Sequence, residues 1–358
     1  HIEGLSGASA GAVNAVALAH GYASAGKQDP REAARASLAR IWGQIMAMGS
    51  LGSFQRQLAT LLWGGLPAEF APTNIISQTF SGMFSPYQSN PLDINPLRSL
   101  LEREIDFEAI ARPGGPKVFV SATHVNTGKA VVFSGKRLTV QAVMASACLP
   151  MLFRAVEIDG EHYWDGGYSV NPAMTPLIDQ CNSADLVLVQ INPLKHEKTP
   201  QTAHEIVDRV NELTFNASLL TQMRAIEFIN RLLADGWLNS ARCKSVLLHR
   251  IDGGKEIQSY PASSKTSTDS AMIQELFELG QRACRHWLAS HFETLGTRST
   301  INISRDYLDD TRLPNFKPGP ADPSPSQPQA QPDQAMPAPP RKRGFRSLMN
   351  SLFRRRKK

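Results

Sequence analysis

The sequence is poor in cysteine and has no long uninterrupted hydrophobic run. Its four cysteines stand far apart among 358 residues and form no C-x-x-C pair, so we expect neither a metal site nor a disulfide framework. We expect four reduced thiols, as in a cytosolic protein. No run of about 20 uncharged apolar residues occurs, so we expect no transmembrane helix.

Acidic residues are absent from residues 341–358, which hold nine of the 38 Lys and Arg residues. The formal net charge of +6 therefore belongs to this tail, because the rest of the chain has 29 basic and 32 acidic side chains, a balance of −3. Nucleic acid is thus not favoured as a partner of the main body. An apolar content of 42% suits a globular enzyme with a sizeable core.

Two C-terminal segments differ in composition from the rest. Residues 314–340 are dominated by Pro, Gln, Ala and Ser, which cannot bury a core, so a disordered linker is expected. Within 341–358, large apolar residues recur at helical spacing between basic clusters, at Phe345, Leu348, Met349, Leu352 and Phe353. This pattern favours an anchor on an anionic membrane surface, with a nucleic-acid tail or a solvated end as alternatives.

The segment Gly7-Ala8-Ser9-Ala10-Gly11 reads G-x-S-x-G, the pattern of a nucleophilic serine on a strand–turn–helix. Residues 2–6 resemble the end of a buried strand, and the alanine-rich residues 10–22 predict a closely packed helix. Such a turn is strained and brings helix and strand close together, so small residues are expected to be required on both sides of Ser9. The first N–H groups of the helix should point at the ligand.

A second motif is Asp165-Gly166-Gly167. It follows a predicted β-hairpin over residues 156–165 that turns at Asp159-Gly160, and it precedes Asn171-Pro172. Upstream stands the small-residue run 145–150, Ala-Ser-Ala-Cys-Leu-Pro. An Asp-Gly-Gly triplet alone is typical of a plain turn, so its meaning depends on the other motif.

The two motifs in this order resemble the patatin-like phospholipase family. Further similar segments are Ser121-Ala122-Thr123, Thr127-Gly128-Lys129 and Asn95-Pro96-Leu97. The resemblance covers roughly residues 3–195 and continues more loosely to about residue 290. It implies a three-layer α/β/α fold with a mostly parallel central sheet and a lipid acyl ester as substrate, without metal or organic cofactor.

The resemblance also implies residue roles. Ser9 is the expected nucleophile and Asp165 its base, the backbone N–H of Ala10 is an oxyanion donor, and Gly7, Gly11, Gly166 and Gly167 complete the two motifs. Apolar residues of the segment before Asp165 suit either the wall of an acyl pocket or the core of the domain: Met144, Leu149, Met151, Leu152 and Phe153. The family also carries a G-G-G-x-R-G loop before the serine. Only eight residues precede Ser9 here, so we expect residues 1–313 to be an N-terminally incomplete domain.

Several alternatives stay open. His249, His286 and His291 follow Asp165, so a Ser–Asp–His triad is an alternative to the dyad. A catalytically impaired module that acts by binding, a thioesterase and a polyester hydrolase are alternative functions. We expect a cytoplasmic location, to which the tail adds peripheral attachment at the inner face of the membrane.

Alternating patterns predict one α/β domain. Helices are expected at 30–48, 95–105, 172–180, 202–235 and 269–292, and strands at 116–122, 129–133, 184–191 and 244–250. Residues 50–92 combine Gly, Ser and Pro with aromatic residues, which suits a loop or cap over the active site or an ordinary insertion.

Overall fold

The structure is a computed structural model that describes residues 1–62, 85–89, 93, 95–150, 152–196, 198–257, 260 and 269–308. The chain separates into two units, His1–Thr311 and Arg312–Lys358. The predicted linker and tail, and residues 63–84 of the predicted cap, lie outside the described residues.

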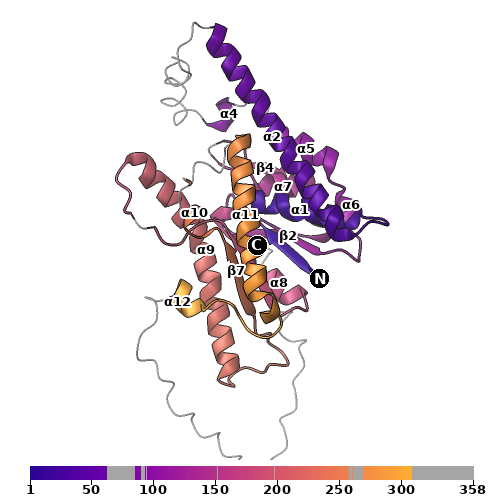
Figure 1. Ribbon diagram of the computed structural model, residues 1–358, viewed down its shortest axis with the longest axis vertical. Helices are drawn as coiled ribbons and strands as arrows, with labels where there is room; N and C mark the ends of the chain where they lie inside the picture. The colour runs from indigo at the N-terminus through magenta and orange to yellow at the C-terminus, as the bar shows by residue number, and fades with distance from the viewer. Residues whose placement is uncertain are drawn as a thin grey trace, which may run out of the picture. The chain divides into compact units, whose positions relative to one another are not determined.

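The described elements alternate along the chain (Figure 1). The strands are β1 Gly4–Gly7, β2 Lys117–His124, β3 Ala130–Phe133, β4 Val156–Ile158, β5 Glu161–Asp165, β6 Asp185–Gln190 and β7 Leu247–Asp252. The helices are α1 Ala10–Ala23, α2 Pro30–Leu62, α4 Pro86–Ser89, α5 Pro96–Glu104, α6 Phe107–Ala111, α7 Val140–Ser146, α8 Thr175–Gln180, α9 Ala203–Ala234, α10 Gly254–Ile257, α11 Ser270–His291 and α12 Ile303–Tyr307. Short 3₁₀ helices are η2 Gly135–Arg137, η3 Gly166–Tyr168 and η5 Phe292–Thr294.

The strands form a five-stranded and a two-stranded sheet. In the first, β1 pairs with β2 in parallel, while β3 and the β4–β5 hairpin add antiparallel strands. In the second, β6 and β7 pair in parallel. The hairpin turns at Asp159 and Gly160, both with positive φ (55° and 81°), as a tight hairpin turn requires.

Helices cover both faces, which gives the three layers of an α/β fold. On one face of β2, Val118 and Val120 pack into a core with α1, α5 and α7. On the other face, η3 contacts β2 and α8 contacts β1. Helix α9 packs on η3 and, with α12, closes a second apolar core over β6 and β7. The predicted α/β fold class is confirmed.

The alanine-rich sequence of α1 serves close packing. A Cβ added at Gly21 would lie 2.4 Å from the Cα of Ala34, so α1 and α2 cross almost backbone to backbone. Figure 1 shows the two indigo helices side by side, in line with the many contacts between them. The predicted helices are all present, but α2 continues to Leu62 instead of ending at 48. The glycines at 49 and 52 do not stop it, because a helical glycine costs only about 1 kcal/mol.

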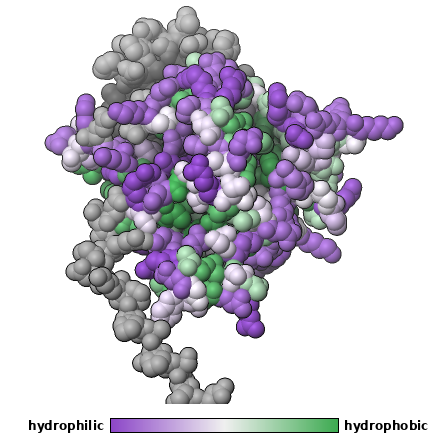
Figure 2. All heavy atoms as spheres, turned by 60° about the horizontal axis from the view of Figure 1, so that its bottom comes forward, coloured by the Kyte–Doolittle hydropathy of each residue, from purple (hydrophilic) through white to green (hydrophobic). Residues whose placement is uncertain are grey.

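The surface carries exposed apolar side chains. Figure 2 shows hydrophobic residues gathered near the middle of the face that it presents, among hydrophilic ones. Independently of that view, Val187, Val189 and Ile191 are exposed along and just after β6, at 43%, 67% and 55%. Within the described residues, none of the helices combines the length and the apolar character that crossing a bilayer would require.

Candidate active site

Ser9 stands between β1 and α1 in a conformation that residues other than glycine rarely adopt. Its backbone has φ 54° and ψ −125°, and its side chain makes no hydrogen bond that caps α1. Such a conformation costs on the order of 1–3 kcal/mol and persists only where the surroundings hold it. The side chain is half-buried. The predicted strand–turn–helix context is therefore present, with a serine hydroxyl that the helix start does not use.

The glycines of the first motif have unequal roles. A Cβ on Gly7 would lie 2.4 Å from both the carbonyl carbon and the oxygen of Gly11. A Cβ on Gly11 would meet no heavy atom within 4 Å. The expectation that small residues are required on both sides of Ser9 is thus wrong for Gly11. The backbone of Gly11 lies where a Cβ of Gly7 would be. Of these two glycines, only Gly7 must therefore lack a side chain.

The register of β2 brings Ser9 and Asp165 to one place. Val120 pairs with both β1 and β3, and Ala122 pairs with both β3 and β5. A strand has two edges, so β3 occupies one, and β1 and β5 meet end to end on the other. There β1 ends at Gly7, opposite Val120, and the antiparallel β5 ends at Asp165, opposite Ala122. The carboxyl ends of two strands distant in sequence converge, with the serine turn following one and the aspartate closing the other.

The segment at the end of α7 hydrogen-bonds to the backbone of both Ser9 and Asp165. The N–H of Ser9 donates to the carbonyl oxygen and to the Oγ of Ser146, both at 3.0 Å. Two residues further, the carbonyl oxygen of Cys148 accepts a 2.8 Å hydrogen bond from the N–H of Asp165. Ser146 is fully buried. One short stretch of chain therefore sets the positions of the serine turn and the aspartate relative to each other.

Asp165 is completely buried, and its surroundings explain the two glycines after it. Its Oδ1 accepts a 2.7 Å hydrogen bond from the N–H of Gly167. A Cβ on Gly166 would lie 2.2 Å from the carbonyl oxygen of Ser121, and one on Gly167 would lie 1.8 Å from the ring of Phe215. The glycines let β2 and α9 close in on the aspartate, which favours a structural as well as a chemical role for the motif.

The buried carboxylate affects neighbouring groups. Burial raises the pKa of the Cys148 thiol to about 12, and the charges of Asp165 and Asp93 add to this increase. Burial also raises the pKa of Tyr168, again with a contribution from Asp165. Both groups are therefore neutral near pH 7. Cys148 is thus a neutral thiol near Asp165, and it is no thiolate nucleophile.

The backbone N–H of Ala10 is available to a ligand. Ala10 is exposed and begins α1. Within the described residues its N–H donates to no acceptor, whereas the N–H of Gly11 is engaged by the carbonyl of Ala8 at 2.8 Å. A helix N-terminus favours negative charge.

Of the three histidines considered for a triad, His249 and His291 have contacts of their own. His249 is fully buried, with Nε2 at 3.0 Å from Asp185 and Nδ1 at 3.2 Å from Thr300. His286 and His291 lie in α11, where the His291 ring packs against Trp287.

Two histidines nearer Ser9 and Asp165 in the sequence are also engaged. His20, in the last turn of α1, accepts from the N–H of Asp106 at 3.1 Å. His124 bonds Glu161 at 2.9 Å. Each of these histidines thus has a structural contact of its own.

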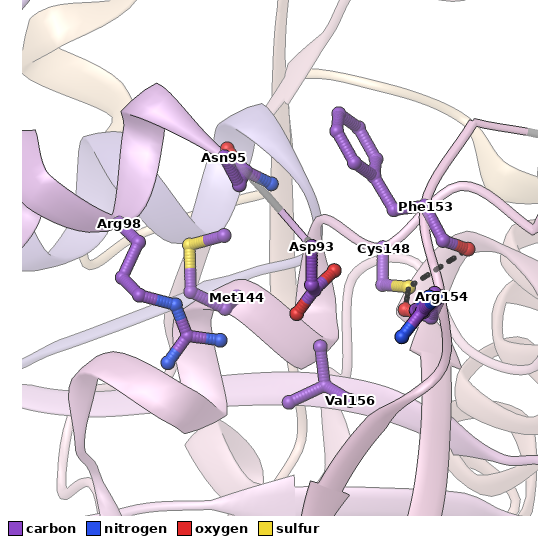
Figure 3. Close-up of a pocket in the computed structure, with 8 residues that line it drawn as sticks. All are labelled: Asp93, Asn95, Arg98, Met144, Cys148, Phe153, Arg154 and Val156. Atoms are coloured by element: carbon purple, nitrogen blue, oxygen red, sulfur yellow. Dashed lines mark hydrogen bonds between the residues drawn. The ribbon is translucent and has the colours of Figure 1, made fainter. Parts of the chain in front are cut away.

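A small cavity lies next to this site (Figure 3). It is lined by Asp93, Asn95, Arg98, Met144, Cys148, Phe153, Arg154 and Val156. Of the five expected wall residues of an acyl pocket, Met144 and Phe153 line this cavity. Leu149 is half-buried and does not line it, Leu152 is 49% exposed, and Met151 lies outside the described residues. Figure 3 shows Asp93 between Arg98 on one side and Cys148 with Arg154 on the other.

The fold and site together define an α/β protein with a strained serine on a strand–turn–helix beside a buried aspartate. The family model described as patatin-like phospholipase matches residues 1–178. Residues 1–178 belong to that family, whose members are hydrolases of lipid esters, and the sequence resemblance is confirmed. No curated protein matches the chain.

Sequence reasoning missed the residues that hold the two motifs together. Ser146 and Cys148 were recognised only as part of a family-like run, and the hydroxyl of Thr123, which donates to the carbonyl of Asp165 at 2.8 Å, had no assigned role. Runs of small residues beside a predicted nucleophile turn are the signal that could have found them. The position of Phe215 against Gly167 had no local signal.

Proposed function

We propose that this chain is a lipid acyl hydrolase in which Ser9 is the nucleophile and Asp165 the general base. The observation that carries the proposal is the end-to-end meeting of β1 and β5 on one edge of β2. It supports the proposal because the turn with a serine hydroxyl that does not cap α1 and the fully buried carboxylate of Asp165 follow strand ends that meet on the same edge of β2. The patatin-like family supplies the class of substrate, an acyl ester of a lipid.

The chemistry runs through an acyl-enzyme. Ser9 Oγ attacks the carbonyl carbon of the ester while its proton passes to the Asp165 carboxylate. The tetrahedral intermediate carries a negative oxygen, for which the free N–H of Ala10 is a donor. Collapse breaks the ester C–O bond, and the proton on Asp165 goes to the leaving alcohol. Water, deprotonated by the same aspartate, then attacks the acyl-enzyme and releases the fatty acid.

The oxyanion donors decide the rate of this reaction. Removing one such donor typically costs about 3–4 kcal/mol of transition-state stabilisation. The N–H of Gly11 is already bonded to the carbonyl of Ala8, so within the serine turn the N–H of Ala10 is the proposed donor.

A fluorophosphonate probe tests the nucleophile directly. We expect Ser9 to be the one serine labelled, because among the serines that the structure describes it alone has a positive φ at the start of a helix, and Ser9→Ala to abolish labelling. Ser24→Ala, at the opposite end of α1, is the matched control and should be labelled normally. Peptide mapping that places the adduct on another serine would sink the assignment. A panel of phospholipids, thioesters and polyesters then identifies the acyl donor.

We also propose that residues 341–358, outside the described residues, bind anionic membrane surfaces. Nine basic side chains and no acidic one support this proposal, together with the apolar residues at helical spacing. A cytoplasmic enzyme tethered in this way would meet its lipid substrate at the inner face of the membrane.

A further inference from the structure

Two hydroxyl side chains of β2 hold the turn that follows β5. Residues two apart on a strand lie on the same face, and Ser121 and Thr123 are both buried. The Thr123 hydroxyl donates to the carbonyl oxygen of Asp165 at 2.8 Å, and the Ser121 hydroxyl donates to the carbonyl oxygen of Val170 at 3.0 Å. The turn over residues 165–170 is therefore hydrogen-bonded to β2 at both of its ends.

The Thr123 hydroxyl also stands in a chain of hydrogen bonds. Its Oγ1 lies 2.8 Å from the carbonyl oxygen of Asp165 and 2.8 Å from the Oγ of Ser169. A threonine hydroxyl has a single proton to donate, so while Thr123 donates to Asp165, Ser169 donates to Thr123. Hydrogen bonds in such a chain strengthen one another where water is largely excluded. The Ser169 hydroxyl therefore acts on Asp165 through Thr123.

Three polar groups of Asp165 are held by three different parts of the chain. Its N–H donates to the carbonyl of Cys148 at 2.8 Å, its Oδ1 accepts from the N–H of Gly167 at 2.7 Å, and its carbonyl accepts from Thr123. Of these three contacts, the first two are made by backbone groups and the third by a side chain. The carbonyl and the carboxylate of Asp165 share one Cα, so a rotation of the peptide would turn the carboxylate as well. The Thr123 hydroxyl therefore restrains the carboxylate, and of the three partners it is the one that a substitution can remove.

We propose that Thr123 is a positioning residue for the base, and that its hydroxyl, supported by Ser169, holds the Asp165 carboxylate in the orientation that proton transfer from Ser9 needs. The inference rests on the proposed function, in which Asp165 takes that proton. Thr123 acts through Asp165 and not on the substrate. Loss of its hydroxyl should therefore slow the reaction of Ser9 and leave the binding of the acyl donor unchanged.

The test compares Thr123→Val, which keeps the shape of the side chain without the hydroxyl, with Thr123→Ser, which keeps the hydroxyl, both in the full chain. We expect Thr123→Val to lower the maximum rate of fluorophosphonate labelling of Ser9 about tenfold, as loss of one hydrogen bond does, at an unchanged half-saturating probe concentration. Thr123→Ser should restore most of the rate. Thr221→Val is the matched control and should be labelled like the wild type, because the Thr221 hydroxyl bonds the carbonyl of Ala217 within its own helix.

Ser169→Ala tests the chain of hydroxyls separately, and it decides the question if Thr123→Val is unstable. It removes only the supporting hydroxyl, so we expect labelling to slow by a smaller factor, about threefold. The double variant Thr123→Val with Ser169→Ala should be no slower than Thr123→Val alone, because Ser169 acts through Thr123. Additive losses would overturn this chain. Thermal unfolding of each variant verifies its fold.

Hydrogen exchange measures the restraint without any reaction. In Thr123→Val, the N–H of Gly167, which bonds Asp165 Oδ1, should exchange about tenfold faster, while the N–H groups in the middle of α1 keep their wild-type rates. Unchanged exchange at Gly167, wild-type labelling of Thr123→Val, or a Thr123→Ser variant as slow as Thr123→Val would each overturn the positioning role. A higher half-saturating probe concentration at an unchanged maximum rate would make Thr123 a binding residue instead. Absence of labelling in the wild type overturns the proposed function, whereas the exchange at Gly167 still reports whether Thr123 holds Asp165, so the two failures are distinguishable.

Discussion

Gly7 bears the steric constraint of the serine turn, and Gly11 does not. We expect Gly7→Ala to lower the free energy of unfolding by about 2 kcal/mol or more, as overpacking of a tight contact does, because its methyl would press on the carbonyl of Gly11 at 2.4 Å. Gly11→Ala should be neutral or stabilise by up to about 1 kcal/mol, since alanine is the better helix residue. Urea unfolding of the two variants compares them directly. Equal losses would show that the contact at Gly7 is not the constraint.

In the proposed reaction, the carboxylate of Asp165 takes the proton of Ser9. We expect Asp165→Asn to slow phosphonate labelling of Ser9 by about 100-fold or more, because an amide cannot take the serine proton. The fold should survive, since the amide oxygen can still accept from the N–H of Gly167. Near-UV circular dichroism and the melting temperature verify the fold.

We expect substitutions of the histidines, unlike Asp165→Asn, to have little effect on labelling of Ser9. Single alanine changes at His20, His124 and His249 should leave most of the labelling rate per folded molecule, because each ring contacts residues other than Ser9 and Asp165. His249→Ala is expected to destabilise the protein, because it empties a buried position that binds Asp185 and Thr300. A loss of about 100-fold from any one of them, in a folded variant, would argue for a triad instead.

At the residue scale, the sequence singles out the two proposed catalytic residues, but not the residues that hydrogen-bond to their backbone. Ser9 and Asp165 stand out because G-x-S-x-G and Asp-Gly-Gly are local patterns that turns impose. Ser146 and Thr123 do not, because their role depends on which backbone groups a folded neighbour presents. Hydrogen bonds between residues more than 40 positions apart leave no periodic trace in a sequence.

At the scale of elements, Glu3 joins the start of β1 to the start of β6. Its carboxylate accepts from the N–H groups of Asn182 and Ser183 at 2.7–3.0 Å. The N–H of Asn182, and then that of Ser183, lowers the pKa of Glu3 in the folded state. The stabilisation is therefore present above the ordinary glutamate pKa and is lost as the pH falls through the lowered value.

Glu3→Gln should thus lower the melting temperature near pH 7 and converge with the wild type in acid. Scanning calorimetry between neutral and acidic pH measures the difference. Glu102→Gln, which changes an exposed carboxylate on α5, is the matched control and should leave the pH dependence unchanged. A Glu3→Gln deficit that stays constant down to low pH would show that the carboxylate charge is not what joins the strands.

The predicted strands and helices are present. They were predictable because the alternation and the helical periodicity of apolar residues reflect burial of one face of each element. The end-to-end meeting of β1 and β5 on β2 was not predictable in this way. It depends on a register between residues 7, 120, 122 and 165, which the pattern of each strand leaves undetermined. The continuation of α2 to Leu62 was missed for another reason: glycine lowers helix propensity without forbidding a helix.

At the scale of the whole molecule, charge divides the chain into two parts with different solution behaviour. Residues 1–340, which include the proline-rich stretch 314–340, carry a net charge of −3, and the tail 341–358 carries +9. A net acidic body does not favour an anionic bilayer, so we expect membrane binding to come from the basic tail. Such binding is electrostatic at long range and weakens as salt rises.

Deleting residues 341–358 should therefore abolish sedimentation with anionic liposomes and leave phosphonate labelling of Ser9 unchanged. Each basic residue near an anionic surface contributes about 1 kcal/mol, so nine of them exceed what thermal motion can disrupt at moderate salt. A matched variant that keeps all nine charges but replaces Phe345, Leu348, Met349, Leu352 and Phe353 with serine should bind more weakly and lose binding at lower salt, because it cannot bury apolar surface. Equal sedimentation of the truncated protein would show that the tail is not the anchor. Tighter binding of the tail to nucleic acid than to liposomes at the same ionic strength would assign it to a different partner.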